Sequence, residues 1–312
     1  MHVAVAAVRD DTGRVLICRR PDDKHMAGFW EFPGGKVEAG ESLGDALRRE
    51  LLEELSITVN ASDPLISLVY DYPDRTVWLD VQAVDSYAGR PRGCEGQTLA
   101  WVAPDELADY RLLPANRPIV TALRLPPLYA ITPPDMRTPE QFATWLGQLR
   151  RHGQMLPWIQ LRLPPKVRDD EPLLAEMLAA GKASGATMIL NGSPAVAQKL
   201  GFAGVHLDGQ ALHGHEPGLL DESLWVGASC HGTRDLTQAR RLEVDFAVLS
   251  PVRRTLSHPE GVMPLGWERF GQLARNAGFP VYALGGLAPT DLDIARRYGA
   301  HGVAGIRAFR AL

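Results

Sequence analysis

The stretch GGKVEAGESLGDALRRELLEELSI, from Gly34 to Ile57, carries the clearest structural signal in the chain. It predicts a helix that begins after Ser42, whose hydroxyl can cap the first turn, with Asp45 favouring the positive end of the helix. Leucines recur every four residues and form a single apolar stripe: Leu43, Leu47, Leu51 and Leu55. We expect this stripe to be buried.

Glutamates occupy another face of the same helix. Glu50, Glu53 and Glu54 lie at positions i, i+3 and i+4, and Glu41 lies just before the helix. Like charges packed this closely repel one another unless a cation lies among them. Carboxylate oxygens suit a hard cation such as Mg²⁺ or Mn²⁺. The alternative interpretation is a solvated charged face, which three glutamates alone would favour.

The spacing across the whole segment is more specific than the three glutamates. The segment fits the pattern G-x5-E-x7-R-E-U-x-E-E-x-G-U, in which U is a bulky apolar residue. The matching positions are Gly35, Glu41, Arg49, Glu50, Leu51, Glu53, Glu54 and Ile57. This pattern resembles the Nudix box. The one departure is Ser56, where the family usually has glycine, and we expect from it a small local adjustment rather than lost activity.

The resemblance implies hydrolysis of a nucleoside diphosphate linked to another group, with Mg²⁺ (or Mn²⁺) as cofactor. Bound cations would neutralise the diphosphate, and one carboxylate would take a proton from the attacking water. The general base is either Glu50 or a glutamate outside the helix, with Glu95 the candidate. The implied metal-binding residues are Gly34, Glu41, Glu50, Glu53 and Glu54. The implied catalytic residues are Arg49, which orients the glutamates through an ion pair, Glu50, Glu53, Glu54 and Glu95.

Four further segments extend the resemblance over Val3 to about Arg124. They are CRRPDDKHMAGFWEFPGG (18–35), YPDR (72–75), CEGQ (94–97) and LPANRPIV (113–120), and they resemble the MutT branch of Nudix proteins, which removes oxidised guanine nucleotides. The branch implies conversion of 8-oxo-dGTP and water to 8-oxo-dGMP and pyrophosphate. Its nucleotide-binding residues fall on Arg20, Phe32, Arg75 and Asn116. An asparagine carboxamide offers a donor and an acceptor to a purine edge.

Each of these four residues also has an ordinary structural interpretation. Asn116 can cap a turn beside Pro114, Phe32 can belong to the core, and the two arginines can be surface residues. Their joint presence at matching positions favours the substrate assignment.

The composition changes most clearly in RLPPLYAITPPD, Arg124 to Asp135, because two proline pairs cannot lie inside a helix or a central strand. We therefore expect a first domain over 1–125 and a second over 128–312. The first should contain strands at 1–9 and 14–20 joined as a hairpin by the turn Asp10–Gly13, strands at 69–72, 76–84 and 97–102, and a short helix from Pro104. This mixture predicts an α+β domain with a mixed sheet between helices.

The second part alternates short apolar runs with helical patterns. The expected strands are 128–132, 158–163, 188–192, 204–209, 225–230, 246–251, 281–286 and 302–306. The expected helices are 140–151, 172–184, 194–200, 235–242, 267–276 and 289–298. Eight buried strands alternating with helices predict a (β/α)₈ TIM barrel or an open α/β sheet, and eight is the number of strands in the barrel.

The segments LYAIT, IQLRLPPK, ILNG, GVHLDGQAL, GASCH, SPVRRTLSHP, ALGGL and GVAGI occur in that order. Over about Leu128 to Phe309 they resemble the thiamine-phosphate synthase and thiazole tautomerase superfamily, which favours the barrel. The expected pocket residues at the strand ends are Gln160, Arg162, Asn191, Ser229, His231, Gly285 and Gly286. The glycine pair, together with Gly305, would cradle a phosphate through backbone N–H groups.

The departures from that superfamily concern its metal-binding carboxylates. The synthases carry Asn-Asp where this chain has Asn191-Gly192, and a further aspartate where it reads GQAL. The lysine expected in the sixth loop is replaced near Ser257-His258, and Arg307 stands where a serine is usual. These changes argue against synthase chemistry. Asn191-Gly192 and His231 look more like the tautomerase branch, and a non-catalytic ligand-binding or assembly role stays open.

Composition excludes several classes of function. The 312 residues include 33 Lys and Arg and 37 Asp and Glu, a formal charge of −4, so no binding to a nucleic acid polymer is expected. The three cysteines are far apart in the sequence, which suits a reducing cytosol better than a disulfide framework. The start MHVAVAAVRDD contains no signal-peptide core, and no uncharged apolar run approaches ~18 residues. We therefore expect a cytoplasmic protein with no membrane partner.

Three hypotheses follow. The first is a Mg²⁺-dependent 8-oxo-dGTP diphosphatase, acting on a nucleoside triphosphate, joined to a barrel of altered or lost synthase activity. The second is a hydrolase that removes faulty diphosphates of the thiamine pathway while the barrel binds a related phosphate. The third makes the barrel a module that senses a ligand or forms a homodimer and thereby regulates its neighbour.

Overall fold

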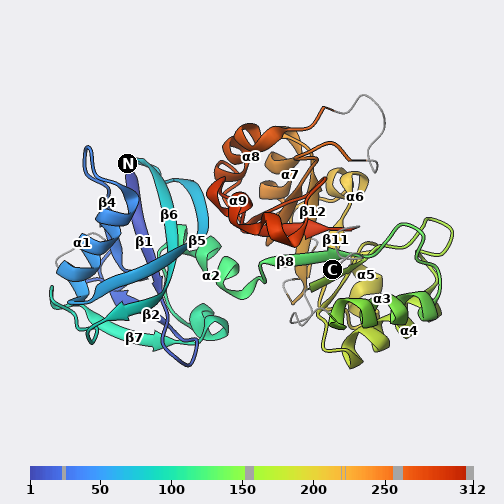
Figure 1. Ribbon diagram of the computed structural model, residues 1–312, viewed down its shortest axis with the longest axis horizontal. Helices are drawn as coiled ribbons and strands as arrows, with labels where there is room; N and C mark the ends of the chain where they lie inside the picture. The colour runs from blue at the N-terminus through green and yellow to red at the C-terminus, as the bar shows by residue number, and fades with distance from the viewer. Residues whose placement is uncertain (23–25, 152–157, 219, 222, 256–262, 307–312) are drawn as a thin grey trace. The chain divides into compact units, whose positions relative to one another are not determined.

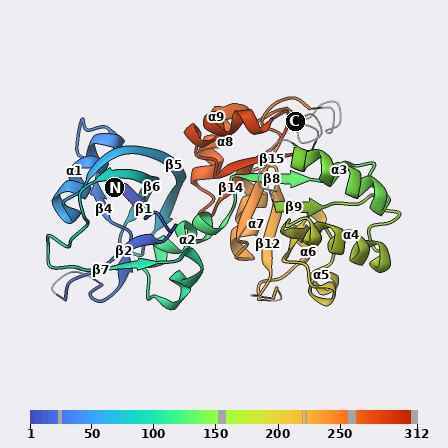
Figure 2. The same cartoon turned by 60° about the horizontal axis from the view of Figure 1, so that its bottom comes forward.

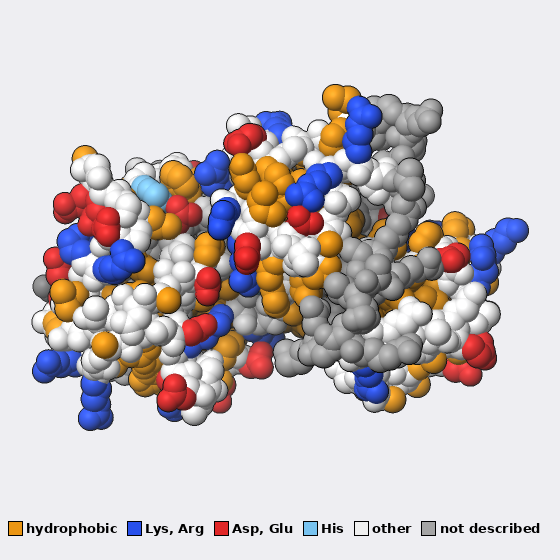
Figure 3. Space-filling view, viewed as in Figure 1, with side chains coloured by type: hydrophobic (Ala, Val, Ile, Leu, Met, Phe, Trp, Pro, Cys, Tyr) orange, Lys and Arg blue, Asp and Glu red, His pale blue; other side chains and the backbone are white. Residues whose placement is uncertain are grey.

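The computed structural model describes residues 1–22, 26–151, 158–218, 220–221, 223–255 and 263–306. The chain divides into two compact units, residues 1–125 and 126–312 (Figure 1). None of the described helices combines the length and the apolar character needed to cross a membrane. On the face drawn in Figure 3, acidic and basic side chains are interspersed rather than gathered into a field of one sign.

The first unit is built on strand β1 (His2–Val8), which lies between two neighbours in a four-stranded sheet of order β4-β1-β6-β5. The other strands of this sheet are β4 (Gly34–Lys36), β5 (Thr58–Asp71) and β6 (Thr76–Ala88). The pairing of β1 with β6 is parallel and the other two pairings are antiparallel, so the sheet is mixed as predicted. A second, three-stranded antiparallel sheet has the order β3-β2-β7. Its strands are β2 (Val15–Arg19), β3 (Trp30–Glu31) and β7 (Thr98–Val102).

Alternate side chains of a strand point to opposite sides of the sheet, and in β1 both sides are buried. Ala4, Ala6 and Val8 belong to one apolar cluster, which includes the leucine stripe of helix α1 (Leu43–Leu55). Val5 and Ala7 belong to another, which includes Ile119 and Ala122 of helix α2 (Arg117–Arg124). The sheet therefore lies between two helices, as the sequence predicts. The short helices η1 (Pro104–Asp109) and η2 (Pro114–Asn116) lead into α2.

Two expectations for the first unit are wrong in detail. The hairpin expected between the first two strands is reduced to its turn, because β1 and β2 join different sheets and share only an isolated bridge between Arg9 and Val15. Both hydrogen-bonding edges of β1 are taken by β4 and β6, which leaves no edge for β2. The strand expected at 69–72 begins at Thr58. Its first half carries three register irregularities and Pro64, which the edge position of β5 tolerates.

The second unit is a closed barrel of eight parallel strands, so the barrel prediction is confirmed over the open sheet (Figure 2). Its strands are β8 (Leu128–Ile131), β9 (Trp158–Leu161), β10 (Met188–Leu190), β11 (Gly204–Leu207), β12 (Trp225–Cys230), β13 (Phe246–Leu249), β14 (Val281–Ala283) and β15 (Gly302–Gly305). Each corresponds to one of the eight predicted runs.

The helices of the second unit lie around the outside of these strands (Figure 1). They are α3 (Pro139–Arg151), α4 (Glu171–Ala183), α5 (Pro194–Leu200), α6 (Gly209–Gly214), α7 (Thr233–Arg241), α8 (Gly266–Arg275), the short η3 (Pro289–Asp291) and α9 (Leu292–Arg297). Helix α6 was not predicted. It has six residues, begins and ends with glycine, and is capped by Asp208, whose Oδ1 accepts from the Ala211 backbone N–H at 2.9 Å.

Aromatic rings fill the inside of the barrel. The rings of Tyr129, Phe246 and Tyr282 are fully buried, with centroids 5.3–5.6 Å apart. The Tyr282 hydroxyl donates to the Pro126 carbonyl, at 2.5 Å. The interior of this barrel is therefore a packed core of inward-pointing side chains, as in other barrels of this kind.

Replacing Ser56 by glycine should stabilise the first unit. Ser56 ends α1 in the left-handed conformation, with φ 57° and ψ 36°, where a side chain is strained and glycine is not. We expect Ser56→Gly to raise the free energy of unfolding by about 1 kcal/mol, measured as a higher melting temperature of the transition of this unit. Ser56→Ala is the matched control, because alanine keeps the strain. An equal gain in both variants would contradict this explanation.

Candidate functional site

Helix α1 has a buried apolar face and an acidic face. Leu47, Leu51 and Leu55 of α1 are buried, whereas Glu53 keeps 60% of its side chain exposed. The Ser42 hydroxyl caps the first turn by accepting from the Asp45 backbone N–H at 3.2 Å. The burial of the leucines fixes the rotation of the helix, so the glutamates face away from the core.

Arg49 holds three of the carboxylates predicted from the sequence. Its guanidinium donates to both oxygens of Glu41 at 2.9 Å and to Glu50 Oε1 at 2.8 Å, and lies 3.5 Å from Glu53 Oε2. It also donates to the Lys36 carbonyl at 3.0 Å. These hydrogen bonds hold the pKa of Glu41 below its usual range and raise that of Arg49. Arg49 therefore fixes the orientation of the acidic cluster.

Glu54 lies in the least solvated part of this cluster. Burial raises its pKa to about 7, against a hydrogen bond of 3.2 Å that Glu54 Oε2 accepts from the Gly34 backbone N–H. The charges of Glu50, Glu95 and Glu31 raise the pKa further. Four carboxylates therefore act on one another here, an arrangement that a bound cation would stabilise.

Glu95 reaches this cluster because its loop is tied to the end of α1. The Cys94 backbone N–H donates to the Glu54 carbonyl at 2.9 Å, and Gln97 Nε2 donates to the same carbonyl at 3.0 Å. Gln97 Oε1 accepts from the Glu95 backbone N–H at 2.7 Å. These bonds satisfy a carbonyl at the helix terminus and place Glu95 where its charge acts on Glu54.

Glu31 is a member of the cluster that the sequence did not reveal. It lies on β3, and β2 pairs with that strand through Cys18 and Arg19. Both of its carboxylate oxygens accept from Arg20 Nη1, at 2.6 and 2.7 Å. Its position in WEFPGG beside the glycine pair was the available signal, but the sheet register was needed to interpret it.

The glycine pair before the helix makes room for Glu50. A Cβ atom on Gly35 would run into the Glu50 carboxylate. The donor set, all carboxylates around a cradle kept open by glycine, fits a divalent cation. Within the described residues, however, no three histidine, cysteine, aspartate or glutamate side chains already form a metal-binding group. Glu50 and Glu53 are paired with Arg49 instead, so they would have to turn to hold an ion.

Asn116 is buried with an unsatisfied acceptor. The residue keeps 6% of its surface exposed, and Oδ1 accepts no hydrogen bond from any described group. The side chain does not cap α2, so the capping interpretation is not realised. An unpaired buried acceptor is costly, and a ligand that donates a hydrogen bond would remove that cost.

The segment before Asn116 is attached to the acidic cluster through β3. The Trp30 backbone N–H donates to the Arg111 carbonyl at 2.9 Å, and the Leu113 N–H donates to the Trp30 carbonyl at 3.0 Å. The next residue along β3 is Glu31. The charge of Glu31 acts on both Glu54 and Tyr72. The side chain of Asn116 and the acidic face of α1 are therefore both connected to β3.

The other three residues predicted to bind nucleotide have different surroundings. Arg20 is paired with Glu31. Phe32 is buried in the apolar cluster with α2, with 4% of its surface exposed. Arg75 is exposed, with its guanidinium carbon 5.6 Å from the centre of the Tyr72 ring. Tyr72, which the sequence analysis missed, makes a hydrogen bond with the backbone of Ala115, next to Asn116.

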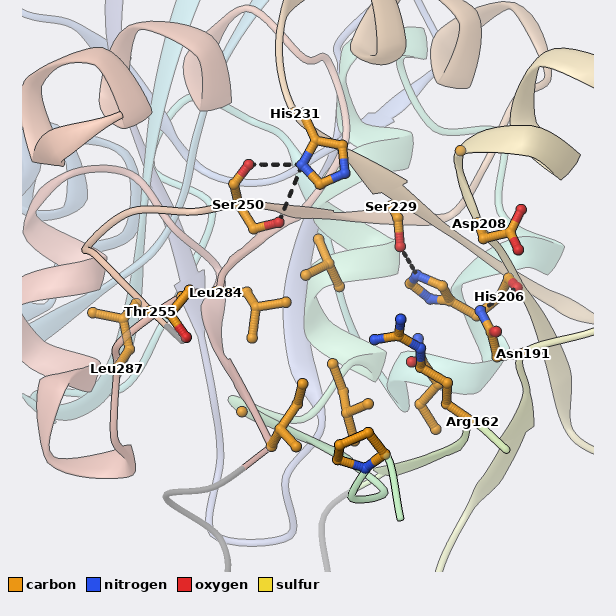
Figure 4. Close-up of a pocket in the computed structure, with 18 of the residues that line it drawn as sticks. Arg162, Asn191, His206, Asp208, Ser229, His231, Ser250, Thr255, Leu284 and Leu287 are labelled. Carbon is orange, nitrogen blue, oxygen red and sulfur yellow. Dashed lines mark hydrogen bonds between the residues drawn. The ribbon is translucent and has the colours of Figure 1, made fainter. Parts of the chain in front are cut away.

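The second unit contains a cavity of about 870 Å³ at the carboxyl ends of its strands. Its lining includes every pocket residue predicted from the sequence: Gln160, Arg162, Asn191, Ser229, His231, Gly285 and Gly286, and also Gly305. Ser257, His258 and Arg307 lie outside the described residues. Figure 4 shows the Arg162 guanidinium projecting toward the middle of the cavity below His206.

Only glycine fits at positions 285 and 286, after β14. Gly285 and Gly286 have φ values of +108° and +66°. A Cβ atom on Gly285 would lie 2.8 Å from Pro251 Cα, and one on Gly286 would lie 2.8 Å from the Arg254 carbonyl oxygen. The β14 loop is therefore packed against the loop after β13, with only backbone facing the cavity at this point.

The charges around the cavity favour an anion. Arg162, Arg168 and Arg254 line it. The two lining aspartates already have partners: Asp208 caps α6, and Asp291 pairs with Arg253 at 3.0 Å. His231 Nδ1 lies 2.9 Å from the Ser250 carbonyl oxygen, so it carries a hydrogen and donates, which leaves Nε2 as the unprotonated nitrogen in the neutral ring (Figure 4).

Comparison with known proteins divides the chain at the same place. A family model described as "NUDIX domain" matches residues 4–122. A second, described as "Thiamine monophosphate synthase", matches residues 128–309.

Individual relatives support both assignments. The first unit is 38% identical to an 8-oxo-dGTP diphosphatase of Escherichia coli K12 over 124 residues, 40% of this chain and 96% of that protein. It is also 38% identical to a CTP pyrophosphohydrolase of the same organism over 122 residues, 39% of this chain and 90% of that protein. The second unit is 31% identical to a putative thiamine-phosphate synthase 2 of Aquifex aeolicus over 188 residues, 60% of this chain and 99% of that protein. The chain therefore belongs to the Nudix hydrolases through its first unit and to the thiamine monophosphate synthase family through its second.

Proposed function

We propose that the first unit hydrolyses 8-oxo-dGTP to 8-oxo-dGMP and pyrophosphate and so removes an oxidised purine from the nucleotide pool. The observation that carries this proposal is the buried Oδ1 of Asn116, which lacks a donor among the described residues. Oxidation at C8 of guanine converts N7 from an acceptor into an N–H donor. Oxidised guanine can therefore satisfy Asn116, whereas guanine would place one acceptor against another.

The phosphate chemistry falls to the acidic cluster. We assign Glu50, Glu53 and Glu54, with Gly34 and Glu41 at its edge, to holding Mg²⁺, which when bound neutralises the triphosphate and lowers the pKa of water. Arg49 keeps these carboxylates oriented. Glu50 Oε1 already accepts a hydrogen bond from Arg49 Nη1 at 2.8 Å, so this oxygen is engaged. We therefore assign the removal of the proton from the attacking water to Glu95.

Relatives of equal identity act on different nucleotides, so the substrate needs a direct test. We would measure kcat/KM of the full chain with Mg²⁺ for 8-oxo-dGTP, dGTP, CTP and thiamine diphosphate. The orphan acceptor predicts a preference for 8-oxo-dGTP over dGTP of about 100-fold or more. A preference for CTP would show that Asn116 reads a different base. Activity confined to thiamine diphosphate would support the hypothesis of thiamine-pathway damage control.

For the barrel we propose binding of a thiamine-related phosphate, with synthase activity altered or lost. The arginine-lined cavity and the glycine loop support an anionic ligand. Gly192 and the segment GQAL supply none of the carboxylates that the synthases use there. A change in the rate of nucleotide hydrolysis on adding thiamine monophosphate would favour the sensing hypothesis, and a dimer dependent on the barrel would favour assembly.

Glu53→Gln should lower turnover of 8-oxo-dGTP by about 100-fold or more, because it removes a charge from the proposed Mg²⁺ site. Glu53 is largely exposed, so the melting temperature without Mg²⁺ should change little. Glu106→Gln, which removes an exposed glutamate from η1, is the matched control and should keep wild-type turnover. Near-normal turnover in Glu53→Gln would remove this residue from the site.

Asn116→Ala should erode the choice of base rather than the phosphate chemistry. We expect the ratio of kcat/KM for 8-oxo-dGTP to that for dGTP to fall by about 10- to 100-fold, the size of a lost hydrogen bond to a buried group. dGTP hydrolysis by the same variant is the internal control. Equal slowing of both nucleotides would mean that Asn116 does not recognise the base.

A further inference from the structure

A chain of hydrogen bonds runs through the interior of the barrel to the cavity. Gln160 Nε2 donates to the Tyr129 hydroxyl at 3.5 Å, and this hydroxyl lies 3.3 Å from His206 Nδ1. His206 Nε2 lies 2.9 Å from Ser229 Oγ, which faces the cavity (Figure 4). The first three side chains are buried, with His206 only 1% exposed. Four side chains from four strands therefore form one connected set.

His206 carries a single ring hydrogen. Burial, together with the charge of Arg162, lowers its pKa to about 3. At neutral pH the ring is uncharged, so one nitrogen donates and the other accepts. The hydrogen bond from Asn191 Nδ2 to the His206 carbonyl, 3.2 Å, involves only the backbone of His206 and leaves both ring nitrogens to the side-chain network.

The partners of Tyr129 decide which nitrogen accepts. The amide nitrogen of Gln160 faces the phenol oxygen and cannot accept a hydrogen bond. The phenol hydrogen must therefore go to His206 Nδ1, because otherwise it would be buried without an acceptor. This order places the ring hydrogen on Nε2, from which it is donated to Ser229 Oγ. The hydroxyl hydrogen of Ser229 is then left to point into the cavity.

From this geometry we infer that Tyr129 and His206 are positioning residues that fix Ser229 as a hydrogen-bond donor toward the ligand. The inference rests on the ligand proposed above for the barrel and adds a requirement to it: the ligand presents an uncharged acceptor, such as an unprotonated ring nitrogen, at Ser229. The apolar side chains of Ile131, Val248 and Leu284 beside it suit a flat ring, and Arg162 suits the phosphate. A ring that offers only an N–H at this position is excluded.

The proton order can be measured without a ligand. We would label the full chain with ¹⁵N-histidine, assign His206 by comparison with His206→Gln, and read the two ring nitrogens by NMR. A hydrogen on Nε2 and none on Nδ1, unchanged from about pH 5 to 8, is the expected result. A hydrogen on Nδ1, or a ring that becomes protonated within that range, would overturn the inference. This spectrum of the wild-type protein decides the order even where a variant does not fold.

Removal of the phenol tests the positioning role. In Tyr129→Phe we expect His206 to lose its single tautomer and show a mixture of the two. Tyr282→Phe is the matched control, because it removes another fully buried phenol whose hydroxyl bonds to the Pro126 carbonyl rather than to His206. An Nε2–H tautomer unaffected by Tyr129→Phe would show that Tyr129 does not set the proton order.

Calorimetric titration with thiamine monophosphate tests the contact with ligand. We expect Ser229→Ala to weaken binding about tenfold and Tyr129→Phe about threefold, with Tyr282→Phe close to wild type. Equal affinity of wild type and Ser229→Ala would overturn the role of Ser229. Failure of the wild-type protein to bind would contradict the ligand proposed for the barrel, whereas the NMR result would still decide the proton order, so the two failures are distinguishable.

Discussion

Repulsion among carboxylates is the constraint around which the first unit is arranged. Glu54 is largely buried, and three other acidic side chains act on it. Burial by itself would favour its protonated form. The surrounding structure counters this with directed donors: the Gly34 N–H on Glu54 and the guanidinium of Arg49 on its neighbours. The buried leucines fix the rotation of α1, and the hydrogen bonds between the Glu95 loop and the end of α1 fix the position of Glu95 relative to the helix. A divalent ion entering this site would take the place of Arg49 as the partner of Glu50 and Glu53, which would have to turn toward it.

The cavity of the barrel, in contrast, is surrounded by positive charges. It is lined by Arg162, Arg168 and Arg254, whereas the two aspartates that line it are engaged in capping a helix and in pairing with Arg253. Beneath them, the interior is aromatic, and burial keeps the imidazole of His206 uncharged. The two units therefore attract anions in different ways, one through a metal ion as proposed and the other through its own cations and backbone.

Much of this could be predicted from the sequence, because the signals are local. Four leucines at helical spacing and a serine cap define α1, and eight apolar runs with intervening helices define a barrel. What could not be predicted depends on pairing between distant segments. The separation of β1 and β2 into two sheets follows from the pairing of both edges of β1 with β4 and β6, which lie far away in the sequence. Glu31 and Tyr72 join the site through sheet register and a backbone contact, neither of which leaves a pattern along the chain.

The recognition of the base that we propose for the unpaired Oδ1 of Asn116 would have a kinetic consequence. Hydrolysis removes pyrophosphate and leaves the base untouched, so a contact made with the base persists after the reaction. Any affinity gained at Asn116 then belongs to the product as well as to the substrate. With pyrophosphate gone, departure of the proposed product, a nucleoside monophosphate, would depend on breaking this contact. An enzyme that selects its substrate through this amide is accordingly subject to slow product release and to inhibition by its own product.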